Sequence, residues 1–252
     1  MPRFFVTASQ IDLENGLVTL VGADAHHIAR SLRMAAGETV TVCDAEKEYD
    51  CVLETFHDER EVIARITSQR EVSTEPRFCA HLYQALPKGD KLDSIIQKAV
   101  ECGVSSITPF ESAHCIVRIK QEAEGKKTER RRRIALEAAK QCGRGCVPEV
   151  SPSTSFAEAL AQAAQADLPL FCYEGEGTQP LRTVLSSYCV DHPDGEMPKV
   201  SIMIGSEGGF SPAEAQAAIE AGMIPIGLGR RILRTETAAA FVLACLVYEW
   251  EL

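Results

Sequence analysis

The sequence of 252 residues lacks several signals that assign a chain to a familiar class. No stretch approaches the roughly 18 uninterrupted apolar residues of a membrane-spanning helix. The start, MPRFFVTASQ, has no long apolar core of a secretory signal, so a cytoplasmic protein is expected. The chain also lacks the GxGxxG turn of dinucleotide-binding folds, which argues against a nicotinamide oxidoreductase, and the GK[ST] motif of a P-loop.

Cysteine pairs with the spacing of a zinc site are absent too. None of the ten cysteines forms a CxxC pair, and the closest two, Cys142 and Cys146, lie far in sequence from any histidine. Zinc sites usually combine paired ligands at short spacing. We therefore expect no metal and interpret the cysteines as buried, reduced thiols.

The chain also lacks the net positive charge typical of a nucleic-acid-binding protein, since its formal net charge is −10. The distribution is uneven, however. Residues 73–150 hold 14 basic and 10 acidic side chains, including the run Arg130, Arg131, Arg132 and Arg133, and both flanking parts are acidic. Phosphate contacts are local, so this basic part can bind RNA. A solvated helix face that binds nothing explains the run equally well.

Residues 1–72 read as short strands rich in Val, Ile and Thr, with Gly, Asp or Glu between them. The segment AHHIARSLRM is the one predicted helix, with Gly37 at its C-terminal cap. This pattern predicts a small β-barrel with one helix, followed by a linker at residues 70–76.

From residue 77 the pattern alternates between strand and helix. Residues 79–86 and 105–110 are apolar strands, and residues 90–103 form a helix with Leu92, Ile95, Ile96, Ala99 and Val100 on one face. A second long helix covers residues 128–143, and Ser155 with Glu158 forms a capping box for the next. Such alternation predicts an α/β domain with a mostly parallel sheet.

Three predicted strands of this domain end in unusual loops: LPLFCYEGEG, KVSIMIGSEGGFSPAE and IPIGLGRRILRTETAAA. Ligands bind at the carboxyl ends of strands in open parallel sheets. In the second loop, glycines precede a helix capped by Ser211 and Glu214, so backbone N–H groups can face a ligand. The third loop carries arginines suited to anions before Thr235, a predicted N-cap. Together the loops predict a binding cleft.

The segment IGSEGGFSPAE followed by LGRRILRTETA resembles the signature of the SPOUT methyltransferases. More narrowly, it is similar to the bacterial enzymes that methylate uracil N3 in 16S ribosomal RNA (RsmE type). MPRFF, HHIARSLRM, KGDKLDSIIQKAVECGVSSITPF and EAAKQCGRGCVPEV agree, so the resemblance runs nearly end to end. Two departures are visible: Ser206 replaces the family's usual proline, and Ala113-His114 replaces its usual Glu-Arg.

The resemblance implies a PUA-like, RNA-binding β-barrel over residues 1–72 and a SPOUT methyltransferase domain with a C-terminal trefoil knot over residues 73–252. It also implies a homodimer that acts on 16S rRNA or the small ribosomal subunit, with S-adenosylmethionine as cofactor. The residues expected to hold this cofactor are those of the three loops: Leu170, Phe171, Cys172, Tyr173, Ile204, Gly205, Ser206, Glu207, Gly208, Gly209, Leu228, Gly229, Arg230, Ile232, Leu233 and Thr235.

Uracil N3 carries a proton and is a poor nucleophile until that proton is lost. Arg230, Arg231 and Arg234 are candidates to stabilise the charge that develops on the base. Glu207 is a candidate general base, or alternatively a cap for a backbone turn. The candidate RNA contacts are the following: Arg3, His26, Arg30, Arg33, Lys88, Lys91, Gln141 and Arg144. Two alternatives stay open: a SPOUT enzyme for another rRNA or tRNA base, and a non-enzymatic RNA-binding assembly factor.

Overall fold

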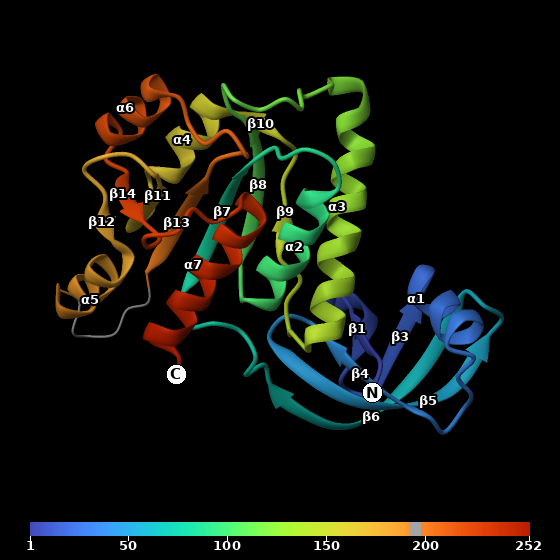
Figure 1. The fold of residues 1–252 in the computed structure, drawn as a ribbon. Helices are drawn as coiled ribbons and strands as arrows, with labels where there is room; N and C mark the ends of the chain where they lie inside the picture. Colours follow the sequence, from blue (N-terminus) through green and yellow to red (C-terminus); the bar gives the residue numbers. More distant parts are fainter. Residues whose placement is uncertain (192–197) are drawn as a thin grey trace. The chain divides into compact units, whose positions relative to one another are not determined.

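The computed structural model describes residues 1–191 and 198–252, which form two compact units (Figure 1). Unit 1 comprises Met1–Glu75 and Ala139–Val147, and unit 2 comprises Pro76–Ala138 and Pro148–Leu252. The segment Ala139–Val147 thus packs with the N-terminal part of the chain, although its sequence pattern continues that of the α/β part. In the described ranges, no helix is long and apolar enough to cross a membrane.

Unit 1 is built on a six-stranded sheet with the order β1-β4-β5-β6-β3-β2. All its pairings are antiparallel except β1 with β4. Register shifts between Asp50 and Cys51 and between Leu53 and Thr55 interrupt the long β5–β6 ladder. The strands are β1 (Arg3–Phe5), β2 (Ile11–Asp12), β3 (Leu17–Val21), β4 (Thr39–Cys43), β5 (Lys47–His57) and β6 (Glu61–Glu71).

The core of unit 1 consists of the inward-facing apolar side chains of these strands and of the helical segment at residues 23–31. Phe4 is 1% exposed, so its ring packs in this core. In β3, Val18 and Leu20 alternate with more exposed positions, as expected for a strand with one buried face, whereas in β4 the residues from Val40 to Cys43 are all buried.

The helical segment of unit 1 differs from the prediction. It consists of a turn of α-helix, α1 (Ala23–His26), and a π-helical turn, η2 (His27–Ser31), so it ends well before Gly37. Arg33 adopts the left-handed φ of 54° after the helix, and Gly37 instead donates its N–H to Leu53 across the start of β4. The predicted linker at residues 70–76 is also partly wrong, because β6 extends through Glu71.

Unit 2 contains the predicted parallel sheet. Its order is β10-β8-β7-β13-β11-β14-β12, β9 pairs with β8, and each described pairing is parallel. The strands are β7 (Cys79–Ala85), β8 (Ser106–Glu111), β9 (Glu149–Val150), β10 (Thr154–Ser155), β11 (Leu168–Cys172), β12 (Gln179–Pro180), β13 (Lys199–Ile204) and β14 (Ile224–Gly227).

Several predicted helix features are confirmed. The predicted face of α2 is buried throughout, and capping boxes start α4 at Ser155 and α6 at Ser211. The predicted N-cap at Thr235 is wrong, because Arg234 occupies that position and Thr235 is the first residue of α7. The helices are α2 (Lys91–Glu101), α3 (Gln121–Cys142), α4 (Phe156–Ala163), α5 (Leu181–Asp191), α6 (Pro212–Glu220) and α7 (Thr235–Trp250).

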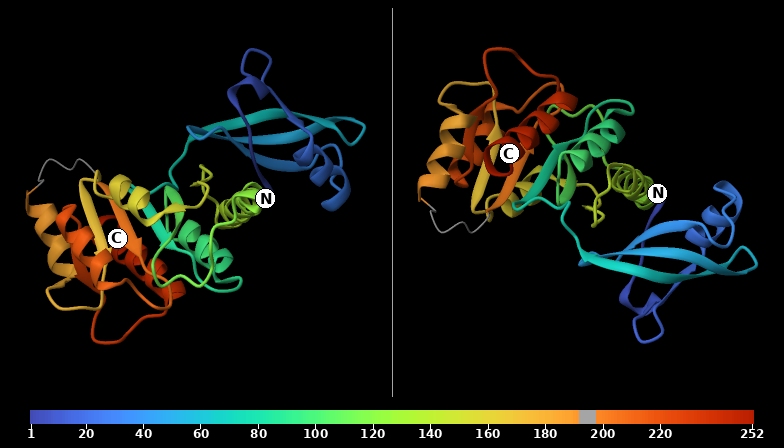
Figure 2. Two further views of the ribbon diagram at one scale, coloured as in Figure 1. Left: turned by 90° about the horizontal axis from the view of Figure 1, so that it is seen from above. Right: turned by 90° about the horizontal axis from the view of Figure 1, so that it is seen from below.

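Helices cover both faces of this sheet (Figure 2). Gln84 of β7 hydrogen bonds to Thr235 of α7, and α7 also packs against α2 and β13. Ser201 of β13 lies on the opposite face, where its hydroxyl donates to the carbonyl of Ala163 in α4. The carboxyl ends of the strands therefore lie between two helical layers. The trefoil knot implied by the resemblance stays a prediction.

All ten cysteines are free thiols, but the expectation that they are buried holds for only three of them. Cys43, Cys51 and Cys115 are buried, whereas Cys79 and Cys142 are exposed. Cys79 begins β7 at the edge of the core, where an apolar neighbour in sequence does not imply burial.

Candidate cofactor cavity and active site

The three glycine-containing loops meet at one cavity. Their strands, β13, β11 and β14, are adjacent in the sheet and parallel, so their carboxyl ends lie at the same edge. The cavity has a volume of about 630 Å³. Its wall is formed by the three loops and by the first turns of α2 and α7: Lys91, Cys172, Tyr173, Glu174, Gly175, Ile204, Gly205, Ser206, Glu207, Gly208, Gly209, Phe210, Leu228, Ile232, Leu233, Arg234, Thr235, Glu236 and Ala238.

The loop after β13 is a tight turn in which two glycines are required. A Cβ atom at Gly205 would lie 3.0 Å from the backbone carbonyl carbon of Gly209 and 3.2 Å from the ring of Phe210. Gly209 has a φ of 63° and donates its N–H to Ser206 at 2.9 Å. The backbone of this loop can therefore approach a ligand closely. Its departure from the family, Ser206, leaves the glycines and their turn in place.

A buried hydrogen-bond node fixes the base of this loop. Thr235 Oγ1 donates to the carbonyl of Gly205 at 2.7 Å and accepts from Gln84 Nε2 at 2.9 Å. Gln84 is 0% exposed and Thr235 is 6% exposed. The node joins β7, the end of β13 and the start of α7. The sequence pattern did not reveal Gln84, because a polar residue at the end of an apolar strand carries no signal of its partner.

Glu207 is held in place by two donors. Its Oε1 accepts from Lys91 Nζ at 2.8 Å and from the backbone N–H of Lys88 at 3.1 Å. Burial raises the pKa of Glu207, but the hydrogen bond from Lys91 and those from backbone amides outweigh burial, so the pKa lies below its ordinary value. A carboxylate with a lowered pKa is a weaker base, which favours the alternative that Glu207 caps backbone N–H groups over the role of general base.

The second departure from the family lies against the same loop. His114 Nδ1 is 2.8 Å from the carbonyl oxygen of Gly208, and the backbone N–H of Ala113 donates to Glu214 Oε1 at 2.7 Å. Glu214 also closes the capping box of α6. The Ala113-His114 turn after β8 therefore supports the glycine loop from outside the cavity.

Most of the predicted cofactor residues line the cavity, and four do not. Leu170 and Phe171 are 0% exposed within β11, because their side chains pack in the core before the strand reaches the cavity. Gly229 and Arg230 lie on the exposed part of the third loop. Of the predicted catalytic arginines, Arg234 lines the cavity, whereas Arg231 is exposed outside it. The prediction did not include Glu174, Gly175, Phe210, Glu236 and Ala238.

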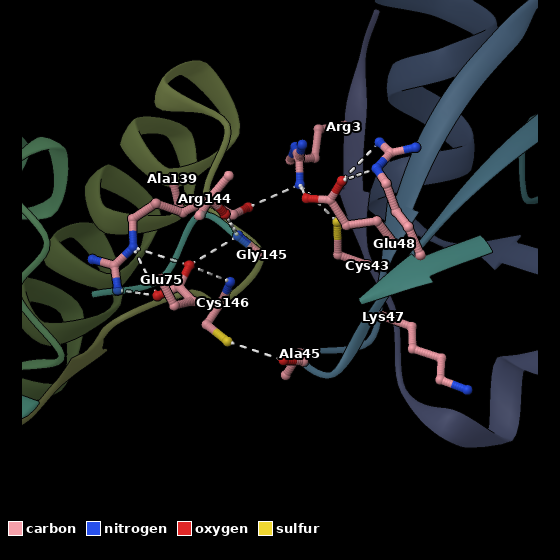
Figure 3. A network of polar contacts seen from close by, with 12 residues as sticks. Arg3, Cys43, Ala45, Lys47, Glu48, Glu75, Ala139, Arg144, Gly145 and Cys146 are labelled. Atoms are coloured by element: carbon pink, nitrogen blue, oxygen red, sulfur yellow. Dashed lines mark hydrogen bonds and ion pairs between the residues drawn. The ribbon is translucent and has the colours of Figure 1, made fainter. Parts of the chain in front are cut away.

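Two of the candidate RNA contacts belong to a polar network inside unit 1 (Figure 3). Arg3 pairs with Glu48 at 2.6 Å and donates to the carbonyl of Arg144 at 3.2 Å. Arg144 pairs with Glu75 at 2.5 Å, and Glu75 also accepts the N–H groups of Gly145 and Cys146. Both arginine side chains are mostly buried, at 13% and 6% exposure, so the network fastens residues 143–147 to the sheet.

The remaining candidates are more accessible. His26 and Arg30 both face Glu59 and expose 61% and 66% of their side chains. Arg33, Lys88 and Gln141 are also exposed.

Three arginines of the run in α3 bind different partners within the protein. Arg131 is buried against Glu124, Arg130 pairs with Asp93, and Arg132 donates to the carbonyl of Val150. The run is therefore not a continuous basic surface.

Comparison with known proteins agrees with this architecture. Residues 74–247 match the family model of an RNA methyltransferase domain, and residues 20–67 match that of an RNA methyltransferase PUA domain. The fold and the cavity thus belong to a two-unit RNA methyltransferase of the SPOUT type. The chain is 32% identical to ribosomal RNA small subunit methyltransferase E of Bacillus subtilis (strain 168), covering 100% of this chain and 98% of that protein.

Two solved structures are similar over almost their whole length. One is ribosomal RNA small subunit methyltransferase E from Neisseria gonorrhoeae bound to S-adenosyl methionine, with 31% identity, 99% and 98% coverage of the two chains and a TM-score of 0.81. The other, described as a methyltransferase from Legionella pneumophila in complex with the cofactor SAM, has 32% identity, 98% and 96% coverage and a TM-score of 0.83. The chain belongs to the ribosomal RNA small subunit methyltransferase E family.

Proposed function

We propose that this chain transfers the methyl group of S-adenosylmethionine to N3 of a specific uridine in 16S ribosomal RNA. The observation that carries the proposal is the convergence of three adjacent parallel strand ends on one cavity, with the family signature in the loops after β13 and β14. The full-length similarity to small-subunit methyltransferases supports the choice of substrate. The uridine N3 position itself rests on the motif resemblance.

The residues around the cavity fit S-adenosylmethionine. The volume of about 630 Å³ lies in the range of small-molecule sites. Within the described part of the chain, Ser206 Oγ is buried without a hydrogen-bond partner, so a polar group of the glycine loop is available to a ligand. The backbone and side chains of residues 172–173, 204–209, 228 and 233 would hold the cofactor. When bound, it supplies a methyl group bonded to a positively charged sulfur.

The protein must make uracil N3 nucleophilic and place it in line with that methyl group. Loss of the N3 proton to solvent water or hydroxide puts negative charge on the base, and a nearby guanidinium stabilises that charge. Arg234 is assigned this role because it lines the cavity next to the anchored Thr235. Glu207 is assigned the anchoring role, because Lys91 and the amide of Lys88 hold its Oε1 in place and its pKa is lowered.

The proposal includes a homodimer. Three large apolar side chains of the third loop and α7 are exposed: Ile232 at 80%, Phe241 at 41% and Tyr248 at 73%. Phe241 and Tyr248 line a second cavity of about 440 Å³ together with α5. An exposed apolar face of this kind favours association of two copies. Dimer formation would also cover the exposed arginines Arg230 and Arg231 or direct them toward RNA.

RNA binding is assigned to exposed cationic and polar side chains of unit 1 and of the loop that precedes α2. His26, Arg30, Arg33, Lys88 and Gln141 meet this criterion. Contacts of these residues with phosphate would position the RNA without reading its sequence. The resulting affinity should fall as the salt concentration rises.

The test is to map methylated nucleotides in 16S rRNA from cells that lack this protein, by primer extension and mass spectrometry. We expect one 3-methyluridine to disappear and to return when the wild-type gene, but not an Arg234→Ala variant, is restored. An unchanged 16S pattern would refute the proposed substrate. Loss of a different modified base would assign the enzyme to that base.

A further inference from the structure

Lys91 occupies a position that its sequence context does not predict. It is the first residue of α2, and its side chain lines the cavity. Its Nζ lies 2.8 Å from Glu207 Oε1 and 3.7 Å from Glu236 Oε2. Glu207 belongs to the loop after β13, and Glu236 belongs to the first turn of α7. One ammonium group therefore contacts two carboxylates from two different walls of the cavity.

Those two carboxylates need a cation between them. Glu207 and Glu236 expose only 27% and 21% of their side chains, so water screens their mutual repulsion incompletely. The hydrogen bond to Glu207 raises the pKa of Lys91, so the lysine stays charged at neutral pH. Arg234 also lines the cavity; it is the last residue of the third loop before α7 and directly precedes Thr235.

We propose that Lys91 is a positioning residue for methyl transfer, which ties the glycine loop at Glu207 to the start of α7 at Glu236 and so sets the spacing between the cofactor loop and Arg234. The inference rests on the proposed function and deepens it. It places Lys91 in the cofactor site rather than among the RNA phosphate contacts.

The experiment compares Lys91→Met, Lys91→Arg and the control Lys98→Met, which removes an exposed charge from the same helix. Titration calorimetry with S-adenosylmethionine gives cofactor affinity, and steady-state methylation of small ribosomal subunits gives kcat and the KM for RNA. We expect Lys91→Met to weaken cofactor binding about tenfold and to lower kcat, with the KM for RNA within about twofold of wild type. Lys91→Arg should retain most of the affinity, and Lys98→Met should match wild type.

A double-mutant cycle tests the bridge itself. Glu207→Gln alone should weaken cofactor binding, but Lys91→Met combined with Glu207→Gln should bind no more weakly than Lys91→Met alone, because the uncompensated charge is gone. Additive losses would overturn the proposal. Glu207→Gln keeps Lys91, so it tests the bridge even if Lys91→Met does not fold.

Other outcomes separate the inference from the function on which it rests. A Lys91→Met variant with unchanged cofactor affinity and a raised KM for RNA would overturn the proposal and indicate that Lys91 contacts RNA. A wild-type protein that binds no S-adenosylmethionine and methylates no RNA would refute the proposed function instead.

Discussion

Replacement of Thr235 by valine should disturb the cofactor cavity without creating a void. Valine has nearly the same volume, so the change removes only the hydroxyl group that bonds to Gly205 and Gln84. Each intramolecular hydrogen bond contributes about 1 kcal/mol, and a buried group left without a partner costs about 1–3 kcal/mol. Gln84 Nε2 keeps its bond to the Ala85 carbonyl at 3.0 Å, which limits the loss on that side.

The expected total for Thr235→Val is therefore about 2 kcal/mol, which corresponds to a fall in melting temperature of roughly 4–8 °C for a unit of this size. The Gly205 carbonyl loses its strongest anchor, so S-adenosylmethionine should bind about tenfold more weakly as the loop loosens. Differential scanning calorimetry and titration calorimetry measure the two effects.

Thr237→Val is the matched control, because Thr237 is an exposed residue of the same helical turn. Thr235→Ser keeps the hydroxyl group and should retain most of the cofactor affinity. A Thr235→Val protein with the melting temperature and cofactor affinity of wild type would refute the assignment of the node as the anchor of the loop.

Three further predictions concern other parts of unit 2. Arg234→Ala should lower kcat about a hundredfold while cofactor affinity stays within about threefold, since the charge that Arg234 stabilises develops only in the transition state. Single-turnover kinetics and titration calorimetry measure the two quantities. Equal losses in both would remove Arg234 from that role. Burial lowers the pKa of His81 to about 4, below the ordinary 6.5. The unfolded chain therefore takes up a proton first as the pH falls, so stability that is full above pH 6.5 declines toward pH 4 by roughly 1.4 kcal/mol per pH unit. His81→Phe should flatten this part of the stability profile in urea titrations, and an unchanged slope would contradict the assignment. Tyr248→Glu should convert the proposed dimer to a monomer in analytical ultracentrifugation, whereas a persisting dimer would place the interface elsewhere.

The α/β unit was largely predictable because its local signals agree with its tertiary contacts. The buried face of α2 follows from apolar spacing alone, and the boxes at Ser155 and Ser211 follow from short side-chain to backbone bonds. The convergence of the three loops follows from the rule that parallel strands end at one edge. Each of these depends on residues close in sequence or on the direction of the strands.

The errors arise where a residue's partner is distant in sequence. Thr235 resembles an N-cap, but its hydroxyl bonds to Gly205 and Gln84 instead of the first turn of its own helix. Gly37 resembles a helix cap, yet the π-helical turn ends the helix earlier. Arg144 lies in a segment that reads as basic, and its guanidinium is turned toward Glu75, 69 residues away. No periodicity encodes such pairs.

The cavity also separates the roles of its two best candidates, Glu207 and Arg234. A general base must have an unoccupied lone pair near the proton it accepts and a pKa near the working pH. Glu207 does not meet the second condition, since the donors from Lys91 and backbone amides outweigh burial and lower its pKa. Arg234 is exposed and lines the cavity, so it can face a base that enters from solvent. A guanidinium next to the uracil also lowers the free energy of the deprotonated base, which reduces the need for a strong base in the protein.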